Sequence, residues 1–276
     1  MKNLENFFIS QFGGRYIGDD GALLPSGEVV ASDLFVEGVH FLPHWFRSLE
    51  DVGRKGALVN LSDIYVMGAE PKYAILGVGF PKKIGKRGAE ALARGLKREL
   101  ESRGVEIVGG DTISHGTILI SITLIGKVWG RRPLTRRLKK GWRIGITGKV
   151  GRVGWELRRA LRGGRLSPKS PFYRPHLPEK FLRRGYRLLG GAIDISDGVG
   201  AELERLSHLN RVGVKLFGKW KRMELCSGEE YQVIFTFRPR EWVGLKRRAK
   251  VARVKIAQIG KGVRGRYRSR CRPHHF

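Results

Sequence analysis

The chain has 276 residues, 41% of them hydrophobic, which is enough for the core of one large domain or two medium ones. No run of about 18 apolar residues occurs, and the start MKNLENFFIS resembles no secretory signal, so neither a membrane span nor a signal peptide is predicted. The net charge of +29 comes almost entirely from residues 101–276, which hold 41 Lys/Arg against 13 Asp/Glu.

The first half of the chain alternates strand and helix patterns after a short helix and turn predicted in residues 1–18. Gly68 and Gly104 are expected to end the two longer helices. The order β-α-β-α-β-β predicts an α+β domain with its helices on one face of a sheet. The predicted elements are a strand at 28–41, a helix at 48–68, a strand at 72–80, a helix at 86–104, and strands at 105–112 and 118–129.

A charged segment with Pro133, residues 130–142, is the best candidate for a linker, and we place the domain boundary between residues 138 and 139. The two predicted domains are therefore 1–138 and 139–276, the second of α/β type. Its expected elements are a strand at 142–148, a helix at 154–161, a loop at 163–178, a helix at 179–189, a strand at 191–196, a helix at 199–209, and strands at 213–218, 231–237 and 254–260.

The cysteine content and the charge restrict the class of protein further. Two cysteines, Cys226 and Cys271, predict neither a disulfide framework nor a zinc site and fit a reducing cytoplasm. The basic excess would attract polyanions such as nucleic acid, a membrane surface or phosphorylated small molecules. Equally, it could be a solvated surface of thermophile-like composition, because the basic runs are scattered rather than confined to one arm.

Aspartates have an unusual distribution along the chain. Only eight of the 25 acids are Asp, and all but Asp51 lie at strand ends or beside glycines. Each can be explained alone, as a turn residue or a helix cap. Asp194 is harder to explain in this way, since a lone carboxylate between Ile193 and Ile195 on a strand is costly unless it is paired or ligated.

Six or seven acids in such positions suggest a metal site. Carboxylate oxygens suit Mg²⁺, which usually takes one or two of them together with phosphate oxygens, so the set predicts several ions that hold a polyphosphate. Neither common phosphate-binding motif is present: the chain has no G-x-x-x-x-G-K-[ST], and GITGKVGRVG does not give G-x-G-x-x-G. An enzyme that used ATP with this sequence would hold the phosphates through metal ions.

The motifs resemble those of the thiamine-monophosphate kinase family, in the aminoimidazole-ribonucleotide-synthetase-like superfamily. The resemblance runs the length of the chain, and its most specific parts are NLSDIYVMGA, GGDT and IDISDG. The other matching stretches are IGDDGALL, SDLFVEGVHF, LTR, ITG, SGEEY and the terminal HHF.

This resemblance implies a homodimer in which the N-terminal domains of two subunits close a β-barrel, each with a C-terminal α/β domain packed against it. It implies transfer of the γ-phosphoryl group of ATP, with Mg²⁺, to thiamine monophosphate. ATP contacts would come from Gly110, Asp111, Arg136 and Ser196, and acceptor contacts from His40, Glu229 and Phe276. Catalytic roles fall on Asp63, Asp111, Arg136 and Asp197. The implied Mg²⁺ ligands are Asp20, Ser32, Asp33, Asp63, Asp111, Asp194 and Asp197.

The sequence departs from the family pattern mainly around the acceptor. Ala31 stands where the family has Ser or Thr, and SGEEY replaces Gly-Gly-Glu-Asp-Tyr. The chain ends RPHHF without the family's main aromatic residue. His40 could also be a core histidine beside Phe41.

Two alternatives therefore stay open. One is a superfamily enzyme with a different acceptor. The other is a basic nucleic-acid-binding protein, although no zinc-finger, RNA-binding or helix-turn-helix signature is present.

Overall fold

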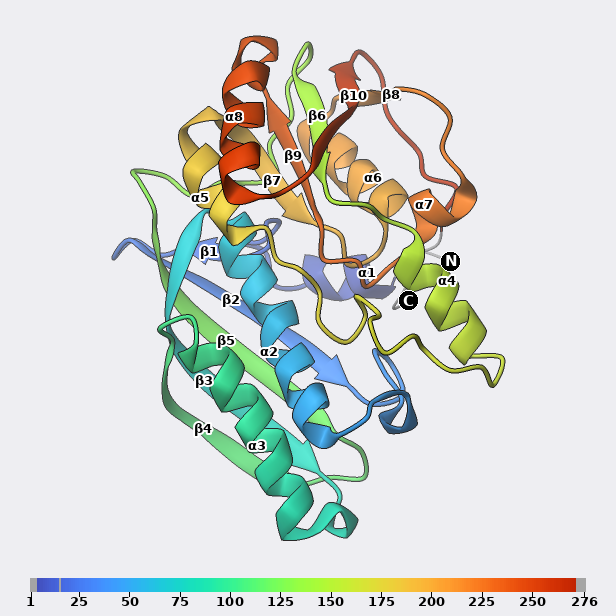
Figure 1. The fold of residues 1–276 in the computed structure, drawn as a ribbon. Coiled ribbons are helices and arrows are strands. Elements are labelled where there is room, and N and C mark those ends of the chain that lie inside the picture. Colours follow the sequence, from blue (N-terminus) through green and yellow to red (C-terminus); the bar gives the residue numbers. More distant parts are fainter. Residues whose placement is uncertain (1–3, 15, 272–276) are drawn as a thin grey trace.

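The structure is a computed structural model that describes residues 4–14 and 16–271. Two five-stranded sheets form its framework, and helices pack against both (Figure 1). Strands of the first sheet come from residues 22–128 and those of the second from residues 143–263, with the predicted linker between them. The mixed α+β character of the chain is as predicted. The exact boundary between residues 138 and 139 stays a prediction.

The first sheet has the strand order β1-β2-β5-β3-β4 and is antiparallel except for the pair β3–β4. That pair is parallel because a helix crosses between the two strands and returns the chain in the same direction. The four predicted strands are all present, with shifted ends, and the sheet also has a short strand, β1, that was not predicted. Their bounds are β1 Ala22–Leu23, β2 Glu28–Val36, β3 Ala69–Phe80, β4 Glu106–Ser114 and β5 Leu119–Val128.

Helices α2 (Leu49–Val66) and α3 (Gly85–Glu101) cover one face of this sheet (Figure 1), as predicted. At the start of α2, the Ser48 hydroxyl accepts a hydrogen bond from the Asp51 N–H at 3.2 Å. The two helices approach closely at Gly53, where an added Cβ would lie 2.3 Å from the Leu92 carbonyl oxygen. The short helix α1 (Leu4–Ser10) precedes the sheet.

The other face of the first sheet and its edge strand are exposed. Leu34, Tyr73 and Ile75 have 50%, 45% and 43% of their surface accessible, and every residue of β4 is exposed. A long edge strand beside an apolar face is a surface that soluble proteins usually cover.

The second sheet has the order β7-β9-β6-β10-β8 and is antiparallel throughout. Its strands are β6 Arg143–Thr147, β7 Leu189–Asp194, β8 Gly213–Leu216, β9 Val233–Phe237 and β10 Ile256–Val263. The helices of this half are α4 Arg152–Ala160, α5 Glu179–Gly185, α6 Val199–Asn210, α7 Arg222–Cys226 and α8 Trp242–Ala252. Short 3₁₀ turns occupy Pro43–Trp45, Lys82–Ile84, Tyr186–Leu188 and Pro239–Glu241.

Two helices, α7 and α8, were not predicted from the sequence. In α8 the buried residues are Leu245 and Ala249, four positions apart on one face. The basic run LKRRAK around them makes the helical pattern of apolar residues too weak to predict a helix. The helix predicted at 179–189 is also shorter than expected. It ends at Gly185 and continues as a 3₁₀ turn into β7.

Cys226 and Cys271 form a disulfide, with their Cα atoms 5.2 Å apart, which corrects the prediction that the cysteines form none. The bond joins the end of α7 to the C-terminal segment. Sequence reasoning missed it because 45 residues separate the two cysteines and only the fold brings them within bonding distance. The cysteine pattern therefore carries no argument for a reducing compartment. Among the described residues, no helix is long and apolar enough to cross a membrane.

Candidate active site

Five of the six aspartates predicted as Mg²⁺ ligands, together with Asp19, line one cavity of about 910 Å³, which we call the acid cavity. They come from both halves of the chain. Asp20 precedes β1, Asp33 lies on β2, Asp63 lies in the last turn of α2, Asp194 ends β7, and Asp197 lies in the turn before α6.

Asp20, Asp63 and Asp194 lie closest together. One carboxylate oxygen from each is within 4.8 Å of the others, so the three could hold one metal ion. Ser62 orients the cluster across the two halves, because its hydroxyl donates a hydrogen bond to Asp194 Oδ2 at 2.9 Å. Asp33 is held differently: its backbone N–H donates to Asn60 Oδ1 at 3.0 Å.

Burial and neighbouring carboxylates raise the pKa of Asp63 well above its usual range, the carboxylates being those of Asp194, Asp33 and Asp20. Burial also raises the pKa of Asp194, helped by Asp20 and Glu202. A cation bound in the cluster would lower the pKa of both carboxyl groups. The raised pKa values and the short distances both indicate that the three carboxylates repel one another when ionised. Their oxygens are suited to bind a cation, which would remove that repulsion.

Arg136 lies against this cluster from the linker. Its Nε and Nη2 donate to the two oxygens of Asp20 at 3.2 and 2.5 Å, in a bidentate pair. Its backbone N–H donates to Asp19 Oδ1 at 2.5 Å. The linker is therefore held against the loop before β1, and one positive charge sits at the edge of the acid cavity.

A second ion pair network stands behind Asp197. Arg205 Nη2 lies 3.2 Å from Asp197 Oδ2, and Nη1 of the same side chain lies 2.9 Å from Glu202 Oε2. Burial raises the pKa of Glu202 to about 7. Asp197 is therefore already paired with a cation, as Asp20 is with Arg136.

Ser32, His40 and Ser196 also line the acid cavity. Their contacts with metal, acceptor and ATP stay predictions. Thr123 Oγ1 donates to Ser32 Oγ at 3.1 Å. The Nδ1 atom of His40 accepts a hydrogen bond from the Val36 N–H at 3.0 Å, so Nδ1 carries no proton and the ring is held in one orientation. His40 lies at the cavity wall rather than in the core.

Other predicted site residues lie elsewhere. Gly110 and Asp111 are on the exposed edge strand β4, where Asp111 pairs with Gly77. Glu229 is fully buried, and its Oε2 lies 2.6 Å from Nζ of the equally buried Lys55. Phe276 lies outside the described residues. The acid cavity of a single chain therefore contains five of the six aspartates predicted to bind Mg²⁺ but neither β4 nor Glu229.

We predict that Mg²⁺ raises the melting temperature, and more so at high pH. The raised pKa values of Asp63 and Asp194 mean that, without metal, the folded state keeps protons that the unfolded state releases. Metal-free stability therefore falls as pH rises from about 4 through the raised values, and Mg²⁺ replaces the protons. Thermal unfolding with Mg²⁺ or EDTA at matched ionic strength checks this. An equal Mg²⁺ effect at about pH 5 and about pH 8 would contradict it.

Comparisons with known proteins identify the family of this chain. Residues 18–128 match the family model "AIR synthase related protein, N-terminal domain". The thiamine-monophosphate kinase of Bacillus subtilis is 29% identical, over 88% of this chain and 84% of the relative. That of Caulobacter vibrioides is 31% identical, over 90% of this chain and 78% of the relative. The chain belongs to the thiamine-monophosphate kinase family.

Solved structures of this family share the fold. AaThiL complexed with AMPPCP and TMP superposes with a TM-score of 0.81 at 24% identity, over 96% of this chain and 91% of that one. The hydrogenase maturation protein HypE in complex with ATP is also similar, with a TM-score of 0.71 at 16% identity, over 93% of this chain and 84% of that one. The fold alone therefore does not identify the phosphoryl acceptor.

Several residues that shape this family member's site were missed from the sequence. Asn60 and Ser62 lie on the same helix as Asp63 and contact Asp33 and Asp194. Both polar residues interrupt an otherwise apolar helical stretch, and that signal could have identified them. Glu202 and Arg205 looked like ordinary surface charges of α6, and nothing local marks Glu202 as buried.

Proposed function

We propose that this chain transfers the γ-phosphoryl group of ATP to thiamine monophosphate, giving thiamine diphosphate. One observation carries the proposal: in a member of this kinase family, Asp20, Asp63 and Asp194 converge in one cavity. ATP and thiamine monophosphate are both anionic. A site for them needs cations, and this cavity is built from carboxylates that can bind divalent ions.

The residues fit Mg²⁺. Asp20, Asp63 and Asp194 would hold it, with Ser32, Asp33 and Asp197 on the same cavity wall for further ions. When bound, Mg²⁺ would neutralise charge on the phosphate oxygens of both substrates. These five acids and one serine exceed what one Mg²⁺ takes, so we propose more than one ion.

The chain's own residues would position the reactants. The acceptor oxygen of thiamine monophosphate is already anionic, so in-line attack needs no strong general base. The bond from the γ-phosphorus to ADP breaks as the bond to the acceptor oxygen forms. Arg136, held by Asp20, contributes a fixed positive charge beside the phosphates. Ser196 and His40 line the same cavity, and in this proposal Ser196 contacts ATP and His40 contacts the acceptor.

We further infer that two copies pair through the exposed face of the first sheet to close a β-barrel. The support is the apolar face of Leu34, Tyr73 and Ile75, continuous with the exposed strand β4. Gly110 and Asp111 would then lie at the surface between subunits, where an ATP contact could form. Within each copy, residues 1–138 would form the dimerising domain and 139–276 the second domain.

Ile75→Asp is expected to convert the dimer into a monomer, because it places a charge in the apolar face that the partner would cover. Light scattering after size exclusion measures the mass directly. Val251→Asp on α8, where Val251 is 63% exposed, is the matched control and should leave the mass unchanged. A wild-type protein that elutes as a monomer would overturn the inferred barrel.

The test of function is formation of ADP and thiamine diphosphate from ATP and thiamine monophosphate, with Mg²⁺ or EDTA. Diphosphate formed only with Mg²⁺ supports the proposal. ATP binding without any thiamine diphosphate would mean a different acceptor. The changed SGEEY segment and the altered C-terminal end would then be the first places to look for its contacts.

A further inference from the structure

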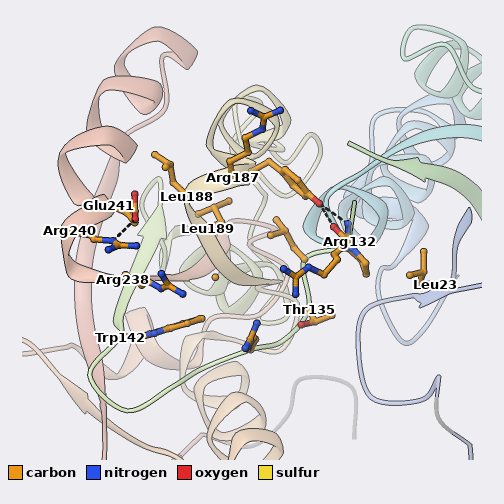
Figure 2. A pocket seen from close by; sticks show the side chains of 15 residues that line it. Leu23, Arg132, Thr135, Trp142, Arg187, Leu188, Leu189, Arg238, Arg240 and Glu241 are labelled. Carbon is orange, nitrogen blue, oxygen red and sulfur yellow. Dashed lines mark hydrogen bonds and ion pairs between the residues drawn. The ribbon is translucent and has the colours of Figure 1, made fainter. Parts of the chain in front are cut away.

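A second cavity, of about 610 Å³, lies on the opposite side of the linker from the acid cavity. Arg136 lines the acid cavity, whereas its neighbours Thr135 and Arg137 line this one. Its walls come from the linker, the start of β7 and the segment after β9 (Figure 2). We call it the arginine pocket.

Five arginines but only one acid line the arginine pocket. The acid, Glu241, forms an ion pair with Arg240, whose Nε lies 3.0 Å from Glu241 Oε1. Within the described part of the chain, no carboxylate forms an ion pair with the other four, which are Arg132, Arg137, Arg187 and Arg238.

An aromatic ring and the chain backbone shape the pocket. The ring of Trp142 packs over Gly190, where an added Cβ would lie 2.1 Å from Cζ3 of the indole. Arg137 Cζ and Lys139 Nζ lie 5.6 and 5.9 Å from the ring centroid. Figure 2 shows Arg238 near Trp142 and Arg132 across the cavity from them, while Arg187 points away.

The linker side of the pocket is held in place. The Tyr186 hydroxyl donates to the Arg132 carbonyl oxygen and accepts from the Arg132 N–H at 3.3 Å. Thr135 packs against β7 so closely that a Cβ on Gly191 would lie 2.5 Å from its carbonyl oxygen. The Arg132 backbone is thus anchored, and its side chain projects from a fixed point.

We propose that the arginine pocket binds a small anion with two or more phosphate groups, at a site separate from the acid cavity. Guanidinium groups gathered in one concavity repel one another, and a multivalent anion relieves that repulsion. Arginine also binds phosphate oxygens in a bidentate manner. The cavity volume is that of a small-molecule site, whereas nucleic acid binds to extended basic stripes.

The test is isothermal titration calorimetry of the full chain with pyrophosphate and with ADP, in EDTA so that the acid cavity holds no metal. Arg132→Gln/Arg238→Gln removes two charges from the arginine pocket. The matched control, Lys83→Gln/Arg87→Gln, removes one charge from the 3₁₀ turn before α3 and one from the first turn of α3, in the lower part of Figure 1. We expect one pyrophosphate to bind per chain. Its affinity should be at least about tenfold weaker in the pocket variant and unchanged in the control.

Equal weakening in both variants would overturn the proposal, because it would mean attraction by the overall positive field. Tight binding of an RNA oligonucleotide that pyrophosphate cannot displace would also overturn it. If ADP binds more tightly than pyrophosphate and Trp142→Leu removes the difference, the ligand carries a ring that packs on the indole. Equal affinity for both supports a site for the phosphates alone. Neither result depends on the kinase activity, which requires metal.

Discussion

Asp63→Asn is expected to abolish phosphoryl transfer, lowering kcat at least about 100-fold, while leaving the metal-free fold as stable as wild type or more stable. Asp63 is partly buried beside Asp194, Asp33 and Asp20, and these carboxylates raise its pKa together with burial. The amide keeps the shape but removes a charge that repels its neighbours. Activity would fall because the cluster loses a carboxylate, not because the helix unfolds.

The measurements are product formation at saturating Mg²⁺ and thermal unfolding in EDTA. Asp51→Asn, the same exchange at the start of the same helix, is the matched control. Asp51 pairs with Arg47 at 3.4 Å and lies outside the acid cavity, so activity should persist. If Asp63→Asn stayed active but melted well below wild type, the carboxylate would have a purely structural role.

Glu229→Gln is expected to lower the free energy of unfolding by about 3–5 kcal/mol, since it leaves the buried charge of Lys55 unpaired. The two side chains have no exposed surface and their Nζ and Oε2 atoms lie 2.6 Å apart. Lys55 Nζ also lies 3.2 Å from the centroid of the Phe172 ring. Burial lowers the pKa of Lys55 to about 8, although Glu229 raises it.

Urea unfolding near neutral pH, in EDTA, measures this loss. Glu101→Gln, in the exposed pair with Lys97 on α3, is the control and should change stability little. The double variant Lys55→Met/Glu229→Gln should recover most of the loss, because no charge is then left buried. If Glu229→Gln instead kept full stability and raised only the KM for thiamine monophosphate, Glu229 would contact the acceptor, as the family resemblance implied.

Local sequence patterns were sufficient for most of the elements and for most of the acid cavity. Strand and helix periods, glycine stops and the linker around Pro133 depend on neighbours in the chain, so they can be read without a fold. The aspartates could be picked out for the same reason. Asp is short, and a strand end or a glycine turn fixes its carboxylate close to the backbone.

Tertiary structure decided which of those residues meet. Ser62 and Asp194 are 132 positions apart, and their contact arises only when α2 lies against β7. Asp111 shares the sequence signal of the other aspartates, yet its strand lies at the open edge of the first sheet. Register and strand order depend on contacts between distant segments, and no local pattern contains that information.

The roles of individual charges were decided in the same way. Lys55 looks like an ordinary polar residue in the sequence, and Glu229 was singled out only by the family resemblance, as an acceptor contact. The packing of two halves of the chain buries the two side chains as a pair. The fold likewise brings Cys226 and Cys271, 45 positions apart, close enough to form a disulfide. The sequence by itself determined which side chains were available at fixed points on the backbone. The fold determined their burial and their partners, which set their charge state and chemistry because desolvation and nearby charges act through space.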